Sequence, residues 1–269
     1  MVKGALSLGL LVVFGVTSIW SLLAGLNIKS TPGIPWSFLA MAVVLWLFWK
    51  YMNGSGPPVS TRGTRREWLR AGPVPEKKRV IGYMAAGLFG ITLLELIVLT
   101  TRLIDFTPGQ VDQIERASAY PAITVIALML MASLVAGVVE EIGFRGVMQR
   151  PLELAYGPSI GITVTAFVFA LIHLPNATIA PHIIPIFFAG SLGWGLLAYL
   201  NESIRPGIVV HFLVDAVAFF WAWLNLDTAK SLGSESIIRD GFDAVFLIQL
   251  LFFGASVFVF IALLRRLRG

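Results

Sequence analysis

Two adjacent carboxylates, Glu140 and Glu141, follow an uncharged run of eighteen residues, 122–139. An ionised carboxylate near the hydrocarbon core of a membrane costs roughly 2.5 kcal/mol or more, so such residues usually pair, line a wet cavity or take part in chemistry. Successive residues of a helix point about 100° apart, so the two side chains face different ways. Arg145 lies four positions after Glu141, where an ion pair along one helix face is expected. Glu140 has no such partner in its own helix and is therefore the residue that most needs an explanation.

Two of the three histidines lie at helical spacing from a second functional side chain. Phe169 and His173 are four residues apart, and so are His211 and Asp215. Residues at this spacing share a helix face. Together with Glu140, the two imidazoles come from three different predicted helices and could line one wet site. For each histidine alone, a hydrogen bond between helices is the alternative role.

Glu95 and His182 are weaker candidates. Glu95 lies inside a predicted helix, where pairing or lining a cavity is the ordinary expectation. His182 lies near the end of another predicted helix, where a structural or interfacial role is favoured.

The composition is that of a membrane protein. Apolar residues make up 57% of the chain and charged residues only 13%, against roughly 25% charged in soluble domains. The net charge of +5 requires no nucleic-acid partner, because basic flanks that face anionic membrane lipids explain it. The chain has no cysteine, which excludes disulfides and thiolate metal sites.

The hydropathy pattern predicts an all-α, polytopic membrane protein with about eight transmembrane helices in one bundle. Each predicted segment approaches the roughly 20 residues that a spanning helix needs, although the fifth is short. The segments are Ala5 to Leu23, Trp36 to Tyr51, Val80 to Leu99, Tyr120 to Val139, Ser159 to Leu174, Ile179 to Leu200, Gly207 to Leu226 and Ala244 to Leu264. The first could instead be a signal peptide, but its apolar run exceeds the roughly 7 to 15 residues of a signal core.

The chain divides at one long polar stretch. Two N-terminal transmembrane helices occupy residues 1–52, a basic cytoplasmic linker residues 53–79, and a six-helix catalytic core residues 80–269, all within a single membrane domain. In the linker, Trp68 and its basic neighbours could form a short interfacial turn. A solvated connector is the favoured interpretation.

The distribution of Lys and Arg predicts the orientation. With the N-terminus in the cytoplasm, fifteen Lys and Arg residues fall inside and five outside. Positive residues are enriched in cytoplasmic loops. The pattern therefore predicts a multi-pass protein of the cell membrane with both termini cytoplasmic.

Three motifs in the second half of the chain resemble those of a known protease family. They look like the motifs of the intramembrane glutamate proteases related to the type II CAAX prenyl endopeptidase, also called the CPBP or ABI family. The resemblance covers roughly residues 120–226 and rests on the order and spacing of the motifs. In this sequence they are Glu140-Glu141-x-x-x-Arg145, Phe169-x-x-x-His173 and His211-x-x-x-Asp215.

The resemblance implies a protease of eight helices that cleaves a peptide bond near the cytoplasmic face without a metal or cofactor. Glu140, helped by His173, would activate a water as general base. His211 and Asp215 would stabilise the oxyanion, an effect typically worth about 3 to 4 kcal/mol of barrier. Glu141 and Arg145 would be a structural pair that orients the helix of Glu140. The substrate would be a membrane-associated or lipidated peptide or protein.

The chain departs from the family pattern at Asp215, where Asn is common. An ionised Asp cannot donate a hydrogen bond, so Asp215 must be protonated or must act by orienting His211. Depth is a second difficulty, since ideal helices place Glu140 and His211 toward one face and His173 toward the other. Convergence requires residues 148–161 to be irregular or re-entrant, or the fourth helix to be long and tilted.

Other functions stay open at the level of sequence. A zinc peptidase could use Glu140, His173 and His211 as ligands, but the chain lacks the His-Glu-x-x-His signature. A non-catalytic membrane scaffold or immunity protein of the same fold is a second alternative. A proton-relaying transporter is a third, although the inverted repeats typical of transporters are not found.

Overall fold

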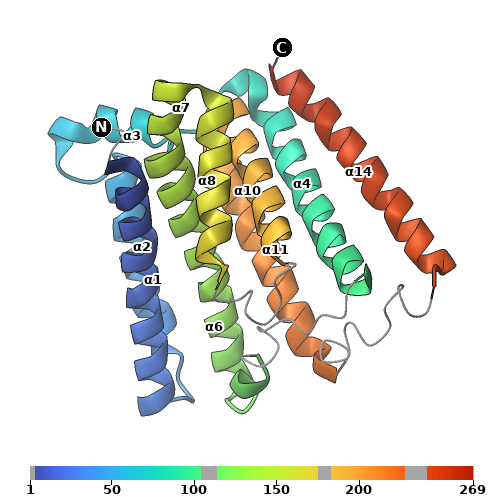
Figure 1. Ribbon diagram of the computed structural model, residues 1–269. Helices are drawn as coiled ribbons and strands as arrows, with labels where there is room; N and C mark the ends of the chain where they lie inside the picture. The colour runs from blue at the N-terminus through green and yellow to red at the C-terminus, as the bar shows by residue number, and fades with distance from the viewer. Residues whose placement is uncertain (1–3, 104–113, 175–182, 228–240, 269) are drawn as a thin grey trace.

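The computed structural model describes residues 4–103, 114–174, 183–227 and 241–268, and these residues form helices and no strand. The helices lie side by side in one bundle, and both termini lie at the same end of it (Figure 1). The predicted all-α class is therefore confirmed.

Five of the described helices are long and apolar enough to cross a membrane. They are α1 (Ala5–Ser30), α4 (Glu76–Leu103), a continuous helix over Ala122–Tyr156, α11 (Arg205–Leu224) and α14 (Ala244–Arg268). Three shorter apolar helices are α2 (Trp36–Met52), α8 (Pro158–Ile172) and α10 (Ile183–Leu200). The eight predicted segments thus all contain helices, while a count of eight spanning helices is not confirmed.

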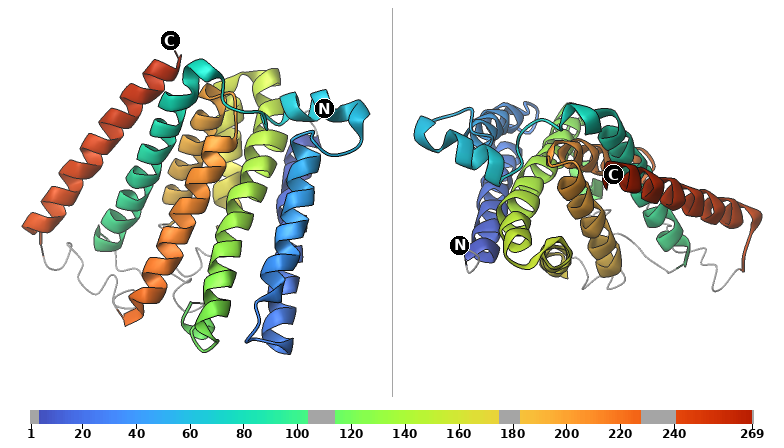
Figure 2. Two further views of the ribbon diagram at one scale, coloured as in Figure 1. Left: turned by 180° about the vertical axis from the view of Figure 1, so that it is seen from behind. Right: turned by 90° about the horizontal axis from the view of Figure 1, so that it is seen from above.

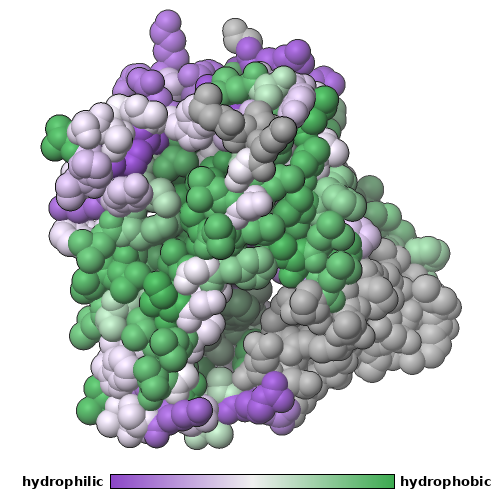
Figure 3. All heavy atoms as spheres, turned by 60° about the vertical axis from the view of Figure 1, so that its left-hand side comes forward, coloured by the Kyte–Doolittle hydropathy of each residue, from purple (hydrophilic) through white to green (hydrophobic). Residues whose placement is uncertain are grey.

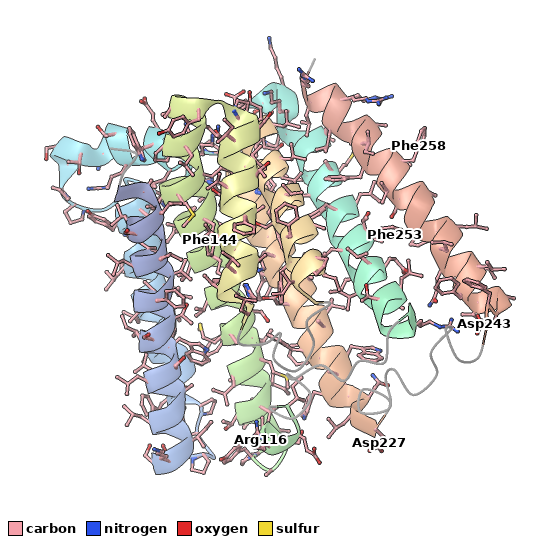
Figure 4. All side chains as sticks on the ribbon, in the orientation of Figure 1. Arg116, Phe144, Asp227, Asp243, Phe253 and Phe258 are labelled. Carbon is pink, nitrogen blue, oxygen red and sulfur yellow. The ribbon has the colours of Figure 1, made fainter. Side chains whose placement is uncertain are left out.

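The surface of the bundle fits a membrane environment. On the face drawn in Figure 3, a green apolar band crosses the middle and purple polar side chains gather toward the two ends. Arg116 and Asp227 lie at the end opposite the termini (Figure 4). Large apolar side chains such as Leu11 and Leu251 are exposed, as expected where lipid rather than water is the solvent.

The fourth predicted segment is much longer than expected, and this length positions the candidate site. The continuous helix consists of α6 (Ala122–Val135), the π-helix η3 (Ala136–Gln149) and α7 (Arg150–Tyr156). Its 35 residues replace the predicted end at Val139 and agree with the long-helix alternative, not with an irregular segment. It ends at Gly157, whose φ of 87° belongs to the left-handed region, and α8 then runs back antiparallel.

The N-terminal helix α1 packs closely against η3. A Cβ atom added to Gly143 of η3 would lie 2.4 Å from a methyl carbon of Val13 and 3.1 Å from the carbonyl oxygen of Gly9. Small residues of this kind let membrane helices approach at backbone distance. The first helix is therefore built into the bundle next to the two carboxylates.

The linker is only in part the solvated connector that the sequence favours, because residues 57–67 are largely exposed but the residues after them are partly buried. It contains the short helix α3 (Arg62–Trp68), which lies at the end of the bundle that carries the termini (Figure 2). Leu69, Ala71 and Val74 after it are buried, and Leu69 packs in one apolar cluster with Ile142 of η3. The sequence did not predict this packing, because basic and apolar residues alternate in the linker and only three of its apolar side chains are buried.

The C-terminal helix α14 lies at the edge of the bundle, next to α4 (Figure 2). Asp243 begins it by accepting a hydrogen bond from the backbone N–H of Phe246 and an ion pair from Arg102 of α4. These two contacts hold the pKa of Asp243 below its usual range. Thr92 and Ser256 join the helices by a 3.0 Å hydrogen bond, whereas Phe258 points away from the bundle and is 74% exposed (Figure 4).

Candidate active site

His211 contacts three carboxylates at the centre of the candidate site. Its Nδ1 lies 3.2 Å from Oε1 of Glu141, and its Nε2 lies 3.8 Å from Oε2 of Glu140 and 3.8 Å from Oδ2 of Asp215. Glu141 is fully buried, whereas the side chains of Glu140 and Asp215 retain 18% and 26% exposure. The structure therefore brings Glu140, His211 and Asp215 together, with the two more accessible carboxylates on one side of the ring.

Nε2 of His211 and the carboxylates of Glu140 and Asp215 need a hydrogen-bond donor among them. If Nδ1–H of His211 donates to Glu141, an unprotonated Nε2 would turn its lone pair toward Glu140 and Asp215. Lone pairs of three acceptors repel one another, so the group requires either a proton on the ring or on one of the two carboxylates, or a donor placed between them. At 3.8 Å the contacts of Nε2 exceed a direct hydrogen bond, but the distance suits a polar group or water between them.

Glu141 and Arg145 form the predicted pair, but Glu141 does more than orient its own helix. The Nη1 of Arg145 lies 3.4 Å from Oε1 of Glu141, and both side chains are fully buried. The Nη2 of Arg145 donates to Oγ of Ser191 on α10 at 2.9 Å. Because Oε1 of Glu141 also contacts His211, this carboxylate connects the structural pair to the imidazole.

Aromatic rings enclose the guanidinium of Arg145. Its Cζ lies 5.0 Å from the ring centroid of Phe169 and 5.6 Å from that of Trp194, with Phe144 at 5.7 Å. A desolvated cation over such rings gains about 2 kcal/mol or more. Phe169, expected only to share a face with His173, thus also holds the cation that stabilises Glu141.

Trp194 of α10 is part of the site and was not recognised from the sequence. Its ring stacks on His211, with centroids 4.3 Å apart and planes 26° apart, and the side chain is buried. A Trp at the centre of an apolar helix, flanked by Gly193 and Gly195, was the available signal, because small neighbours make room for a large ring between helices.

His173 joins the site through aromatic side chains. It ends α8, its Nδ1 lies 2.7 Å from the carbonyl oxygen of Phe169, and its ring stacks on Phe187 at 3.9 Å. Phe169 in turn contacts Trp194, with centroids 6.2 Å apart. A donating Nδ1–H leaves the lone pair of Nε2 available as an acceptor.

The register between the fourth helix and α8 places His173 near the level of Glu140. Phe144 faces Phe169 at 5.0 Å between ring centroids, and a Cβ on Gly161 would lie 2.7 Å from the Cγ of Glu153. Glu140 precedes Phe144 by four residues, and His173 follows Phe169 by four residues. Because the two helices run antiparallel, both steps go the same distance in the same direction along the bundle, so Glu140 and His173 lie near one level. The depth difficulty noted in the sequence is resolved by the extra length of the fourth helix.

A buried polar ladder continues from Arg145 toward the end of the bundle that carries the termini. Gln149 donates to Oε1 of Glu153 at 2.7 Å and to the carbonyl oxygen of Gly195 at 3.0 Å. Glu153 is paired with Arg70 from the linker through two hydrogen bonds. The sequence carried a signal, since Arg145, Gln149 and Glu153 recur every four residues, but the partner 83 residues away was not predictable.

Of the two weaker candidates, only Glu95 lies within the described residues. The Oε2 of Glu95 in α4 is buried and has no hydrogen-bond partner among the described residues. His182 lies outside the described residues. Within the part of the chain that the structure describes, no three His, Asp or Glu side chains are arranged to hold a metal ion, so the zinc set of Glu140, His173 and His211 finds no geometric support.

Apolar helices of membrane length surround a buried cluster of acidic and basic side chains, as in an integral membrane protein. The sequence profile of the family described as "Type II CAAX prenyl endopeptidase Rce1-like" matches residues 122–217. This match supports the relationship to the CAAX-protease family that the three motifs predicted, and all seven motif residues fall within it. This is a protease family, which supports a hydrolase. Neither the curated proteins nor the solved structures contain a match.

The helices η3 and α11 pack closely at Gly137. A Cβ at this position would lie 2.9 Å from the carbonyl oxygen of Ile208 and 3.0 Å from the backbone nitrogen of Phe212. Gly137→Ala should therefore push α11 away from η3, separate Glu140 from His211 and destabilise the protein by about 1 to 3 kcal/mol. Thermal melting in detergent measures the effect. Gly87→Ala on α4, where the new Cβ meets no atom within 4 Å, is the control, and equal melting of the two variants would contradict the expectation.

Proposed function

We propose that the protein is an intramembrane endopeptidase that hydrolyses a peptide bond of a membrane-associated or lipidated peptide or protein. The observation that carries this proposal is the convergence of Glu140, His211 and Asp215, with Oε2 of Glu140 3.8 Å from the imidazole inside an apolar bundle. The family match over residues 122–217 includes these residues and supports the proposal. No cofactor or metal is part of the proposal.

In the proposed reaction, the ionised Glu140 accepts a proton from a water molecule, and the resulting hydroxide attacks the scissile carbonyl carbon. His211 and Asp215 face the oxygen on which negative charge develops, and donors placed there lower the barrier. The proton held by Glu140 then passes to the leaving amine, which breaks the peptide bond. His173 assists by accepting a hydrogen bond from the water at Nε2.

Three residues act as positioning groups in this scheme. Glu141 accepts a hydrogen bond from Nδ1 of His211, which leaves Nε2 directed at the reacting group. Trp194 fixes the plane of the same ring. Arg145 holds the Glu141 carboxylate in position through their buried contact.

The proposed orientation places both termini in the cytoplasm. The helix ends that lie with the termini carry basic residues: Arg150 begins α7, and Arg265, Arg266 and Arg268 are in the last turn of α14. Cytoplasmic flanks are enriched in Lys and Arg. His211 lies six residues after Arg205, whose Nε donates to the linker carbonyl of Ala71, so the ring lies roughly 9 Å from that face at 1.5 Å per residue.

Asp215 separates two versions of the mechanism. A protonated Asp215 donates to the oxyanion, and Asp215→Asn should then keep or raise activity at neutral pH, because an amide donates without taking up a proton. An ionised Asp215 that orients His211 would lose this hold in the variant and change the pH profile of kcat. We expect the first result with a quenched peptide that carries a prenylated cysteine. A clear loss of activity at unchanged melting temperature would contradict it.

A further inference from the structure

A second, larger feature of the molecule lies away from the three motifs. A cavity of about 1400 Å³ opens between the linker, α8, α10 and α14, at the end of the bundle that carries the termini. None of the proposed catalytic residues lines it. Its side chains are of two kinds, cationic at the rim and aliphatic along the wall.

The rim carries an excess of positive charge. Six basic residues line the cavity against two acidic ones, Glu67 and Glu202, which leaves a net charge of +4. The basic residues are Arg66, Arg70, Lys78, Arg150, Arg265 and Arg268.

Three of the cations are available for a ligand. Arg70 is paired with the buried Glu153, and Lys78 is 2.6 Å from Glu202. In contrast, no ion pair or side-chain hydrogen bond within the described residues involves Arg66, Arg265 or Arg268, and all three are exposed. Guanidinium groups bind phosphate through two parallel hydrogen bonds.

The wall of the cavity is aliphatic and partly exposed on the side of α14. Leu192 and Leu196 of α10 face Ile261 and Leu264 of α14 across it, and Ile261 is 43% exposed. A small soluble anion would make no favourable contact with this apolar wall. A molecule with an anionic head and apolar chains would satisfy both parts of the cavity at once.

We propose that this cavity binds an anionic phospholipid of the surrounding membrane. Its phosphate contacts Arg66, Arg265 and Arg268 at the rim, and its acyl chains lie along the wall between α10 and α14. Basic pockets between membrane helices at the level of the headgroups are suited to such lipids.

The test uses the full-length protein purified in detergent. Short-chain phosphatidylglycerol is titrated and the bound complex is counted by native mass spectrometry. Arg265→Gln with Arg268→Gln should weaken binding by at least about tenfold, since each arginine near a membrane surface contributes appreciably to the attraction. The matched control is Arg62→Gln with Arg266→Gln, which removes the same charge from exposed positions outside the cavity and should change the affinity less than about twofold.

Two further binding measurements identify the chemical class of the ligand. Ile261→Gln, at an exposed wall position, should weaken phosphatidylglycerol binding and leave competition by inorganic phosphate unchanged. Phosphatidylcholine of the same chain length should bind at least about tenfold more weakly. Equal loss in the two double variants, equal binding of phosphatidylcholine, or full displacement of the lipid by an equal concentration of inorganic phosphate or an acidic peptide would each overturn the proposal. Melting temperatures of all variants show that each is folded.

Discussion

Glu140→Gln should reduce peptide hydrolysis by at least about a hundredfold while leaving the protein folded. Removal of a general base typically costs a factor of about 10² to 10⁴, and the amide of Gln keeps the shape of the side chain without accepting the proton of the water. The measurement is the cleavage rate of a quenched, prenylated peptide by protein in detergent.

The control for this variant is Glu76→Gln. Glu76 begins α4, is exposed, and pairs only with Arg79 in the part of the chain described, so its loss should leave both rate and melting temperature unchanged. A Glu140→Gln protein that retains the wild-type rate would remove Glu140 from the mechanism.

Glu141→Ala should cause the largest loss of stability. The substitution leaves Arg145 fully buried without its carboxylate and removes the acceptor for Nδ1 of His211. Breaking one side of a buried pair costs about 3 to 5 kcal/mol, which corresponds to a fall in melting temperature on the order of 10 °C. Folded yield should fall at least as much as activity.

Two comparisons show whether the lost pair is the cause. Glu140→Ala should melt at a higher temperature than Glu141→Ala, since Glu140 keeps 18% exposure and its contact with Nε2 of His211 is 3.8 Å long. Replacing both partners, with Glu141→Leu and Arg145→Met, should recover part of the loss, because no charge is then left unpaired. Equal melting of the two alanine variants would refute this division of roles.

Much of the helical arrangement was predictable because apolar runs of membrane length are strong signals. The beginnings of α2 and α14 agree with the sequence, and the pairs at a spacing of four residues, Glu141 with Arg145 and Phe169 with His173, lie in contact. These features depend on local periodicity alone.

What the sequence did not reveal depends on contacts between distant segments. The π-helix over Ala136–Gln149 follows from packing, since no residue propensity favours such a long run, and π-turns are frequent at functional sites. The stacking of Trp194 on His211 and the pairing of Arg70 with Glu153 join residues far apart in the chain. The length of the fourth segment was not predicted, because the charged residues Glu140, Glu141 and Arg145 are typical of a helix end. In the structure they lie in the middle of the helix over Ala122–Tyr156.

The most direct test of the proposed function compares the membrane peptidome of cells that carry the wild-type protein with that of cells that carry Glu140→Gln or Glu76→Gln at equal expression. The account predicts that at least one peptide fragment is present with the wild type and with Glu76→Gln and absent with Glu140→Gln, and the end of that fragment gives the cleavage site. Identical fragments in all three would contradict an endopeptidase that depends on Glu140 and would favour a scaffold that has kept the fold.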